Sequence, residues 1–269
     1  MGRFDGWLFV SDIDGTLLSA PEYELSKENR QAIEEFIQEG GRFTFASGRC
    51  LFGLMDLYHK LNLTEPLIAG NGALVYDPHK DEFLSVSELD KEKSLDIYHY
   101  VKERLPDVGF EIFTDRIIYF IDDNESVQHH IHAEDIPYPF VTLEEATGPW
   151  TKLVFGIIPS EMEKSREIVF SAPTAKDFNI AQGGKWYLEL SDKNISKGIA
   201  ILRLAAKYNI PKEKIITLGD NENDISMFTI TPHSFAVSNG TDKAKNAANH
   251  LTGPGGSKGS AIADVLKQL

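Results

Sequence analysis

Cysteine is almost absent from the 269-residue chain, in which Cys50 stands alone. One cysteine cannot form a disulfide within the chain, so the fold cannot depend on a disulfide framework. This usage fits a reducing compartment, where thiols stay reduced.

Long hydrophobic runs are also missing. The longest apolar stretches, such as Trp7–Val10 and Leu153–Ile158, are far shorter than the roughly 20 residues of a membrane-spanning helix. The N-terminal segment has no charged region followed by an apolar stretch and a cleavage site. Gly6 stands where the myristoylation pattern requires Ser or Thr. We therefore expect a cytoplasmic protein that does not associate with membranes.

Basic residues are few, with 27 Lys and Arg against 41 Asp and Glu and a formal net charge of -14. Nucleic-acid backbones attract surfaces rich in Lys and Arg, so we expect no nucleic-acid partner. Any phosphate site must be a local exception to this acidic surface, and a bound divalent cation would help to create one.

What the sequence does contain is a series of short apolar runs, each followed by a polar cluster with glycine. Such runs are typical of parallel strands buried on both faces. The runs are Trp7–Val10, Phe43–Ala46, Leu67–Ala69 and Ile215–Leu218. Helical patterns over Ser26–Gln38 and Ser196–Tyr208 lie between them. This alternation predicts a parallel α/β sheet, whose ligands bind outside the carboxyl ends of the strands.

The middle of the chain has a different, α+β pattern. We expect a helix over Lys91–Leu105, hairpins around residues 114–116 and 182–185, and a strand followed by a helix across residues 153–170. A mixed segment between two α/β halves predicts a domain inserted at residues 86–189, with residues 1–85 and 190–269 forming the other domain.

Asp12 and Asp14 follow the first expected strand. Two carboxylates so close repel each other unless a cation lies nearby, and Mg²⁺ suits oxygen ligands and phosphate substrates. One carboxylate could attack phosphorus and the other could act as general acid and base. Alone, the segment fits a polar turn equally well. An EF-hand loop is excluded, because no third acidic ligand precedes Gly15 and no Glu stands at the last loop position.

Three further clusters offer groups that could bind phosphate or metal. Ser47-Gly48-Arg49 places a hydroxyl and backbone N–H groups at a strand-to-helix turn, although a simple helix cap explains it better in isolation. Lys197 lies in the first turn of its helix, against the helix dipole, and a surface lysine remains an equal alternative. Gly219–Asp224 carries acids four residues apart, which suits a metal site or an acidic capping loop.

Taken in order, these clusters resemble the four motifs of the haloacid dehalogenase (HAD) superfamily of phosphohydrolases, and its Cof-like branch in particular. The matching segments are Asp12-Ile13-Asp14-Gly15-Thr16-Leu17, Ser47, Lys197 and Gly219–Asp224, and Gly70-Asn71-Gly72-Ala73 is also similar to that branch. The resemblance extends over essentially the whole chain.

The resemblance implies a Rossmann-like catalytic core, made by residues 1–85 and 190–269, with an α/β cap at residues 86–189. It also implies roles for individual residues. Asp12 would be the nucleophile and a Mg²⁺ ligand, and Asp14 would be the general acid and base, with its backbone carbonyl on the metal. Asp220 would be a further metal ligand, and Asp224 would order metal-bound water. The phosphoryl group would be held by Ser47 and Lys197, Asn223 would orient Asp12 or the phosphate, and the substrate would lie near Gly48, Arg49 and Asn71.

The expected activity is Mg²⁺-dependent hydrolysis of a small phosphorylated metabolite, such as a sugar phosphate, through an aspartyl-phosphate. A phosphosugar mutase and a non-catalytic phosphometabolite-binding protein are the alternatives. We expect a monomer or a weak homodimer. Substrate choice is expected to depend on aromatic and histidine residues of the insert, namely His129, His130, His132, Tyr138, Trp150, Trp186 and Tyr187.

Overall fold

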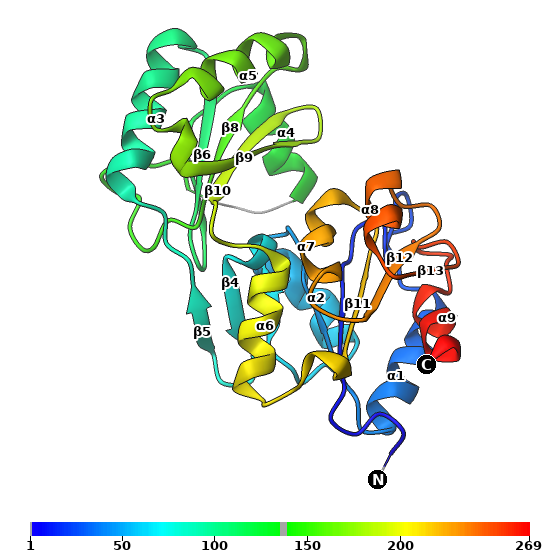
Figure 1. Ribbon diagram of the computed structural model, residues 1–269. Coiled ribbons are helices and arrows are strands. Elements are labelled where there is room, and N and C mark those ends of the chain that lie inside the picture. The colour runs from blue at the N-terminus through cyan, green and yellow to red at the C-terminus, as the bar shows by residue number, and fades with distance from the viewer. Residues whose placement is uncertain (1, 135–138) are drawn as a thin grey trace. The chain divides into compact units, whose positions relative to one another are not determined.

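The structure, a computed structural model, describes residues 2–134 and 139–269. The chain folds into two compact units (Figure 1). The first, called the core unit, comprises Met1–Arg49, Leu54–Ser85 and Ser196–Leu269. The second, called the inserted unit, comprises Cys50–Gly53 and Val86–Ile195.

The core unit is built on a parallel sheet with the strand order β13-β12-β11-β1-β2. Its strands are β1 (Leu8–Ser11), β2 (Arg42–Phe45), β11 (Ile215–Gly219), β12 (His233–Val237) and β13 (His250–Thr252). The central strand β1 pairs in parallel with both β11 and β2, and all four of its residues are buried. This burial on both faces explains why the strand is an unbroken apolar run rather than an alternating one.

Successive side chains of β1 point to opposite faces of the sheet, and helices cover both faces. Phe9 contacts Phe36 of α1 on one face, with ring centroids 5.7 Å apart. Leu8 and Val10 pack on the other face in one cluster with Ile201 of α6. The helices of the core unit are α1 (Lys27–Gln38), α2 (Phe52–Lys60), α6 (Lys197–Lys207), α7 (Ile225–Phe228), α8 (Asp242–Ala247) and α9 (Ala261–Gln268).

A small second sheet, with the order β3-β4-β5, extends the core unit beyond β2. Its strands are β3 (Leu67–Ala69), β4 (Leu74–Asp77) and β5 (Glu82–Val86). Ala46, just after β2, forms a parallel bridge with Ile68 of β3. The loop after β3 therefore lies next to the loop after β2, which brings Asn71 close to Ser47.

The inserted unit has an antiparallel sheet of its own, with the order β7-β6-β8-β10-β9. Its elements are α3 (Lys91–Arg104), β6 (Gly109–Phe113), β7 (Ile118–Asp122), α4 (Glu125–Glu134), β8 (Lys152–Gly156), α5 (Met162–Ser171), β9 (Phe178–Gly183) and β10 (Tyr187–Asp192). The hairpins β6–β7 and β9–β10 and the helix α3 lie where the sequence predicts them. The predicted fold class, a parallel α/β core with an α+β insert, is confirmed.

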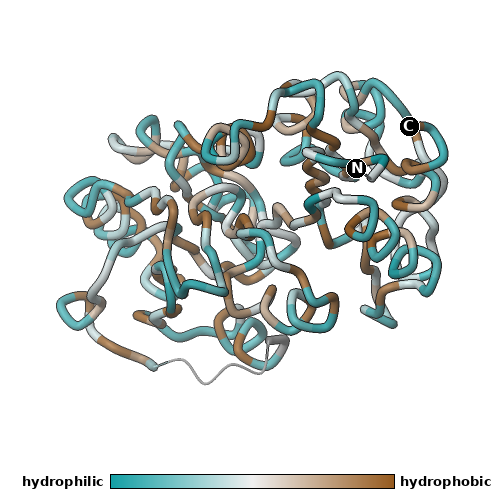
Figure 2. Tube along the Cα trace, turned by 90° about the horizontal axis from the view of Figure 1, so that it is seen from below, coloured by the Kyte–Doolittle hydropathy of each residue, from teal (hydrophilic) through white to brown (hydrophobic). Residues whose placement is uncertain are grey.

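Each unit encloses its own hydrophobic interior. Hydrophobic stretches of the trace run inside each unit, and hydrophilic stretches are common at its periphery (Figure 2). The sheet of the inserted unit packs through Phe110, Ile112 and Phe155 against Ile97 and Val101 of α3. Within the described part of the chain, no helix has the length and apolar content needed to cross a membrane.

Gly198, in the first turn of α6, provides a test of how closely this helix packs against the segment that contains Ser226. Alanine favours a helix over glycine by about 1 kcal/mol, but a methyl group here would overlap the carbonyl oxygen of Ser226. We predict that Gly198→Ala lowers the free energy of unfolding by about 1–3 kcal/mol, measured by urea denaturation.

The matched control is Glu34→Ala, at an exposed position of α1. It should leave the free energy of unfolding within about 0.5 kcal/mol of the parent protein. An unchanged or raised stability of Gly198→Ala would show that α6 is not held this closely against the segment that contains Ser226.

Candidate active site

The site lies at the carboxyl ends of the central strands. The backbone N–H of Asp12, directly after β1, donates to the carbonyl of Leu218 in β11 at 2.8 Å. This contact brings the loop after β1 to the loop after β11. Asp12, Asp220 and Asp224, called the acidic trio, each place a carboxylate oxygen within 4.8 Å of the others.

Lys197 joins two members of the acidic trio. Its Nζ donates to Asp12 Oδ1 and to Asp224 Oδ1, both at 2.6 Å, and its side chain is fully buried. Ser196 positions this lysine, because its side chain accepts a hydrogen bond from the N–H of Ile199 and so caps the start of α6. The sequence patterns therefore converge in space, although they lie up to 212 positions apart along the chain, between Asp12 and Asp224.

Asp224 organises the loop that carries it. Its Oδ2 accepts hydrogen bonds from the N–H groups of Asp220 at 2.9 Å and Asn221 at 3.0 Å. A side chain at Gly219 would overlap this carboxylate. Both oxygens of Asp224 are thus occupied by Lys197 and by the loop backbone, whereas Asp12 and Asp220 keep more capacity to accept other groups.

The electrostatics of the trio show a shortage of positive charge. Burial raises the pKa of Asp12 to about 8, with Lys197 opposing the rise and Asp224 adding to it. Burial and the nearby Asp224 also raise the pKa of Asp220. Burial acts to lower the pKa of Lys197, but Asp12 and Asp224 outweigh it and hold that pKa above its usual value. One ammonium group does not balance three carboxylates, so the trio favours a further cation.

Two residues of the first motif, to which the sequence analysis assigned no role of their own, complete this cluster. The Thr16 hydroxyl donates to Asp220 Oδ1 at 2.9 Å. Gly15 has a φ of +87°, and a side chain there would overlap the Asp220 carboxylate. Their position inside the Asp-x-Asp-Gly-Thr segment was the available signal, since a loop that approaches another so closely needs glycine.

Asp14 lies outside the acidic trio and pairs with Arg49. Arg49 Nε donates to Asp14 Oδ2 at 2.7 Å, and Nη2 donates to Asp14 Oδ1 at 2.5 Å. Both side chains are partly exposed, 29% for Arg49 and 48% for Asp14. Ser47, two residues before this arginine, is buried, and its Oγ accepts a hydrogen bond from the N–H of Arg49 at 3.2 Å.

Asn71 and Asn223 form an amide pair, in which Asn223 Nδ2 donates to Asn71 Oδ1 at 3.0 Å. The N–H of Asn71 donates to the carbonyl of Ser47 at 2.9 Å, and Asn71 adopts a positive φ of 57°. A side chain at Gly48 would lie 3.2 Å from the Asn71 amide. These contacts place Gly48, Asn71 and Asn223 side by side at one edge of the candidate site.

The predicted specificity residues of the inserted unit have more varied surroundings. Trp150 is buried in the hydrophobic core and donates to Ala146. His129 stacks on Trp186 with ring centroids 4.9 Å apart, and His130 contacts the buried Glu111 at 2.8 Å. Tyr138 lies outside the described residues. Within residues 2–134 and 139–269, the group with metal-ligand spacing is the acidic trio and not the histidines.

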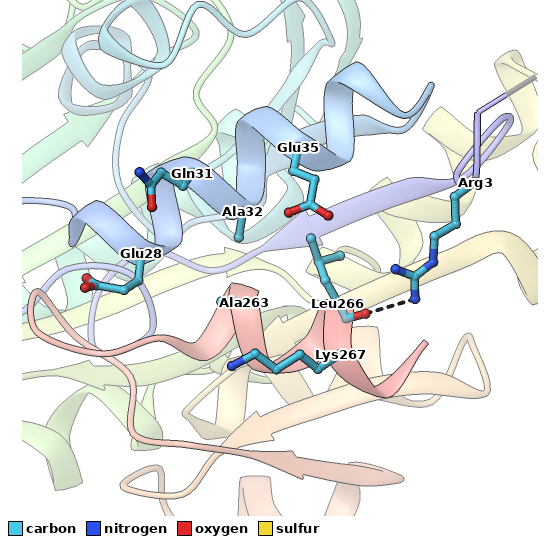
Figure 3. A pocket seen from close by; sticks show the side chains of 8 residues that line it. All are labelled: Arg3, Glu28, Gln31, Ala32, Glu35, Ala263, Leu266 and Lys267. Carbon is cyan, nitrogen blue, oxygen red and sulfur yellow. Dashed lines mark hydrogen bonds between the residues drawn. The ribbon is translucent and has the colours of Figure 1, made fainter.

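A hollow of 430 Å³ lies elsewhere in the core unit, between α1 and α9 (Figure 3). Glu28 and Glu35 line it from α1. Arg3 donates to the carbonyl of Leu266 at its other wall, at 3.2 Å. None of its lining residues is a predicted site residue.

The whole chain resembles proteins whose family is established. A family model described as haloacid dehalogenase-like hydrolase matches residues 9–266. The chain belongs to the haloacid dehalogenase-like hydrolase family. The chain is therefore an enzyme of the phosphatase type, as the sequence motifs led us to expect.

Individual relatives cover nearly the full length. Phosphatase YwpJ of Bacillus subtilis is 26% identical, over 97% of this chain and 99% of the relative. 5-Amino-6-(5-phospho-D-ribitylamino)uracil phosphatase YwtE of the same organism is 28% identical, over 90% of this chain and 91% of the relative. The crystal structure of TM0651 from Thermotoga maritima superposes with a TM-score of 0.86 at 29% identity, covering 98% of this chain and 97% of that one.

The raised pKa of Asp12 predicts a pH dependence of stability in metal-free protein. In the unfolded chain Asp12 loses its proton near the ordinary pKa of 3.8, whereas in the folded protein it does so near about 8. Between these values the folded state holds a proton that the unfolded state has lost, so this residue makes stability fall as pH rises. Asp12→Asn should flatten that fall, measured by urea denaturation in EDTA from about pH 5 to about pH 8.

Asn223→Ala is the control, because it removes a polar side chain close to the trio that carries no ionisable group. It should keep the pH slope of the parent protein. An equal slope in Asp12→Asn and the parent would show that Asp12 ionises in the folded protein as readily as in the unfolded chain.

Proposed function

We propose that this protein is a Mg²⁺-dependent phosphomonoesterase that acts through an aspartyl-phosphate on Asp12. The observation that carries the proposal is the fully buried Lys197, held between Asp12 and Asp224. A buried ion pair of this kind contributes little net stability. It does, however, fix one Asp12 oxygen in place and leave the other available.

The residues present fit a divalent cation. Three carboxylates lie within 4.8 Å of one another with one ammonium group among them, and burial, together with the neighbouring carboxylates, raises the pKa of Asp12 and of Asp220. Asp12 and Asp220 would hold the ion with the backbone carbonyl of Asp14, and Asp224 would act through water. Oxygen ligands and a phosphate substrate favour Mg²⁺. When bound, the ion supplies charge neutralisation that lets a carboxylate meet a phosphate dianion.

The phosphoryl group would be held by Ser47 and Lys197. The Lys197 ammonium has three N–H donors, and two of them go to Asp12 and Asp224. The third can donate to a phosphoryl oxygen. The Ser47 hydroxyl accepts from Arg49 and keeps its own hydrogen for the substrate. The amide pair of Asn71 and Asn223 borders the same loop and would orient the phosphate.

Two displacements complete the reaction. In the first, an Asp12 oxygen attacks phosphorus, the bond to the ester oxygen breaks, and Asp14 protonates the leaving alcohol. In the second, Asp14 takes a proton from water, the water oxygen attacks phosphorus, and Asp12 is released as a carboxylate. Positioning and charge neutralisation provide most of the catalysis in such a transfer.

For the substrate we propose a small phosphorylated sugar or sugar alcohol. The relative YwtE is named for a substrate with a 5-phospho-D-ribityl group, which is a phosphorylated sugar alcohol chain. The formal net charge of -14 disfavours polyanionic substrates such as nucleic acid. Residues 86–189 are proposed to act as the cap that selects the alcohol.

The proposal predicts that the protein releases phosphate from p-nitrophenyl phosphate and from members of a sugar-phosphate panel, and that EDTA abolishes the release. Asp12→Asn should lower kcat by about 10³-fold or more, because it removes the nucleophile. Asp56→Asn, at an exposed position of α2, serves as the control and should keep the parent rate. Full activity of Asp12→Asn, or none in folded wild-type protein with Mg²⁺, would refute the mechanism.

Metal binding has a separate readout in thermal stability. Mg²⁺ at about 100 times its Kd should stabilise the protein by about 2.7 kcal/mol. Asp220→Asn should raise the Tm of the metal-free protein, because it relieves repulsion in the trio, and should reduce the Mg²⁺-induced increase. A Tm that Mg²⁺ raises equally in Asp220→Asn and wild type would place the ion elsewhere.

A further inference from the structure

Two cations serve the candidate site, and their surroundings differ. Lys197 is fully buried and held by two carboxylates, so it cannot move without leaving them unpaired. The Arg49 side chain is 29% exposed and reaches Asp14, whose side chain is 48% exposed. Arg49 is therefore the cation with room to change partner.

The pairing of Arg49 with Asp14 occupies both oxygens of the carboxylate. Nε and Nη2 of Arg49 reach Asp14 Oδ2 and Oδ1 at 2.7 and 2.5 Å. A guanidinium fork of this kind fits a carboxylate and a phosphate equally well, because both present two oxygens at the same spacing. A phosphate dianion carries more charge than a carboxylate, so it can compete for the same fork.

The backbone of Arg49 already lies beside the residue proposed to hold the phosphate. Its N–H donates to Ser47 Oγ at 3.2 Å, with Gly48 between them. A phosphoryl group that is hydrogen-bonded to Ser47 would thus lie close to the backbone end of the Arg49 side chain. Asp14, in contrast, comes from the loop after β1 and has no other hydrogen bond among the side-chain contacts of the described residues that could hold it once Arg49 leaves.

We propose that Arg49 is a positioning residue that exchanges partners. Without substrate it holds the Asp14 carboxylate by both oxygens. When a phosphate ester binds, the fork moves to a phosphoryl oxygen, and Asp14 is released to transfer a proton to or from the ester oxygen. No covalent bond changes in this step. The inference rests on the proposed function, since it assigns the phosphate and Asp14 the parts described above.

The exchange predicts a specific coupling between the two side chains in phosphate binding. Asp14 competes with phosphate for Arg49, so Asp14→Asn should tighten the binding of inorganic phosphate. Arg49→Ala should weaken it by about tenfold, as expected for one charge-assisted contact. In Arg49→Ala protein the further change Asp14→Asn should have little effect, because there is no fork left to compete for.

A double-mutant cycle tests this with isothermal titration of inorganic phosphate into Mg²⁺-loaded wild type, both single variants and the double variant. Arg42→Ala is the matched control, because Arg42 also pairs with a carboxylate, at 3.1 Å from Glu65, and is not a predicted site residue. It should bind phosphate as the wild type does. Circular dichroism and Tm establish that each variant is folded.

Arg49→Lys separates charge from geometry. A lysine keeps the positive charge but cannot hold a carboxylate by both oxygens. We expect it to recover part of the phosphate affinity lost in Arg49→Ala and to leave kcat for p-nitrophenyl phosphate reduced. Full recovery of both quantities would overturn the fork geometry on which the exchange depends.

The outcomes distinguish this inference from the proposed function. If Asp14→Asn tightens phosphate binding equally with and without Arg49, the effect is plain repulsion and the exchange is wrong, whatever the turnover. If Asp14→Asn does not tighten binding, Asp14 does not compete and the exchange is also wrong. Failure of the proposed function shows instead as absent hydrolysis by the wild type. Wild type that binds no phosphate would overturn both.

Discussion

The contact of Lys197 with Asp12 and Asp224 is the interaction on which the site depends. A fully buried ammonium group is costly unless its hydrogen bonds are satisfied, so its two 2.6 Å bonds are obligatory rather than incidental. They tie together the end of β1, the start of α6 and the loop after β11. The Ser196 cap and the close seat of Gly198 fix the helix that carries the lysine. At this end of the sheet, three segments of the chain are therefore held together by the one positive charge of Lys197.

The single positive charge of Lys197 does not balance the three carboxylates of the acidic trio. Burial raises the pKa values of Asp12 and Asp220 because the fold removes them from water without full compensation. A sequence selected for stability alone would not retain three such carboxylates. The deficit has a use if a divalent cation and a phosphoryl group come and go, since a fully balanced site would have no affinity for a further cation. On the proposed function, stability is given up at the position where phosphoryl transfer would need a bound cation.

Sequence alone predicted the strands, helices and loops well, for physical reasons. β1 and β11 are buried on both faces, which makes them plain apolar runs, and the carboxyl ends of parallel strands must meet at one edge. Side-chain partners were harder to foresee. The pairing of Asp14 with Arg49, the contact of Thr16 with Asp220 and the burial of Glu111 in β6 depend on tertiary placement. No periodicity encodes which polar group another one meets.

Lys197 and Arg49 differ in how firmly they are held, and this difference bears on which parts of the site could vary between relatives. Lys197 is fixed by burial, so it can position Asp12 only in one way, whereas the partly exposed Arg49 is proposed to exchange partners. The inserted unit has its own sheet and its own hydrophobic core, separate from the cluster that contains Val10 and Ile201 in the core unit. The TM0651 structure, at 29% identity over nearly the full length, has the same fold with a TM-score of 0.86. On the proposed function, a fixed charge centre and a separately packed insert would let the alcohol part of the substrate change while the phosphoryl chemistry stays constant.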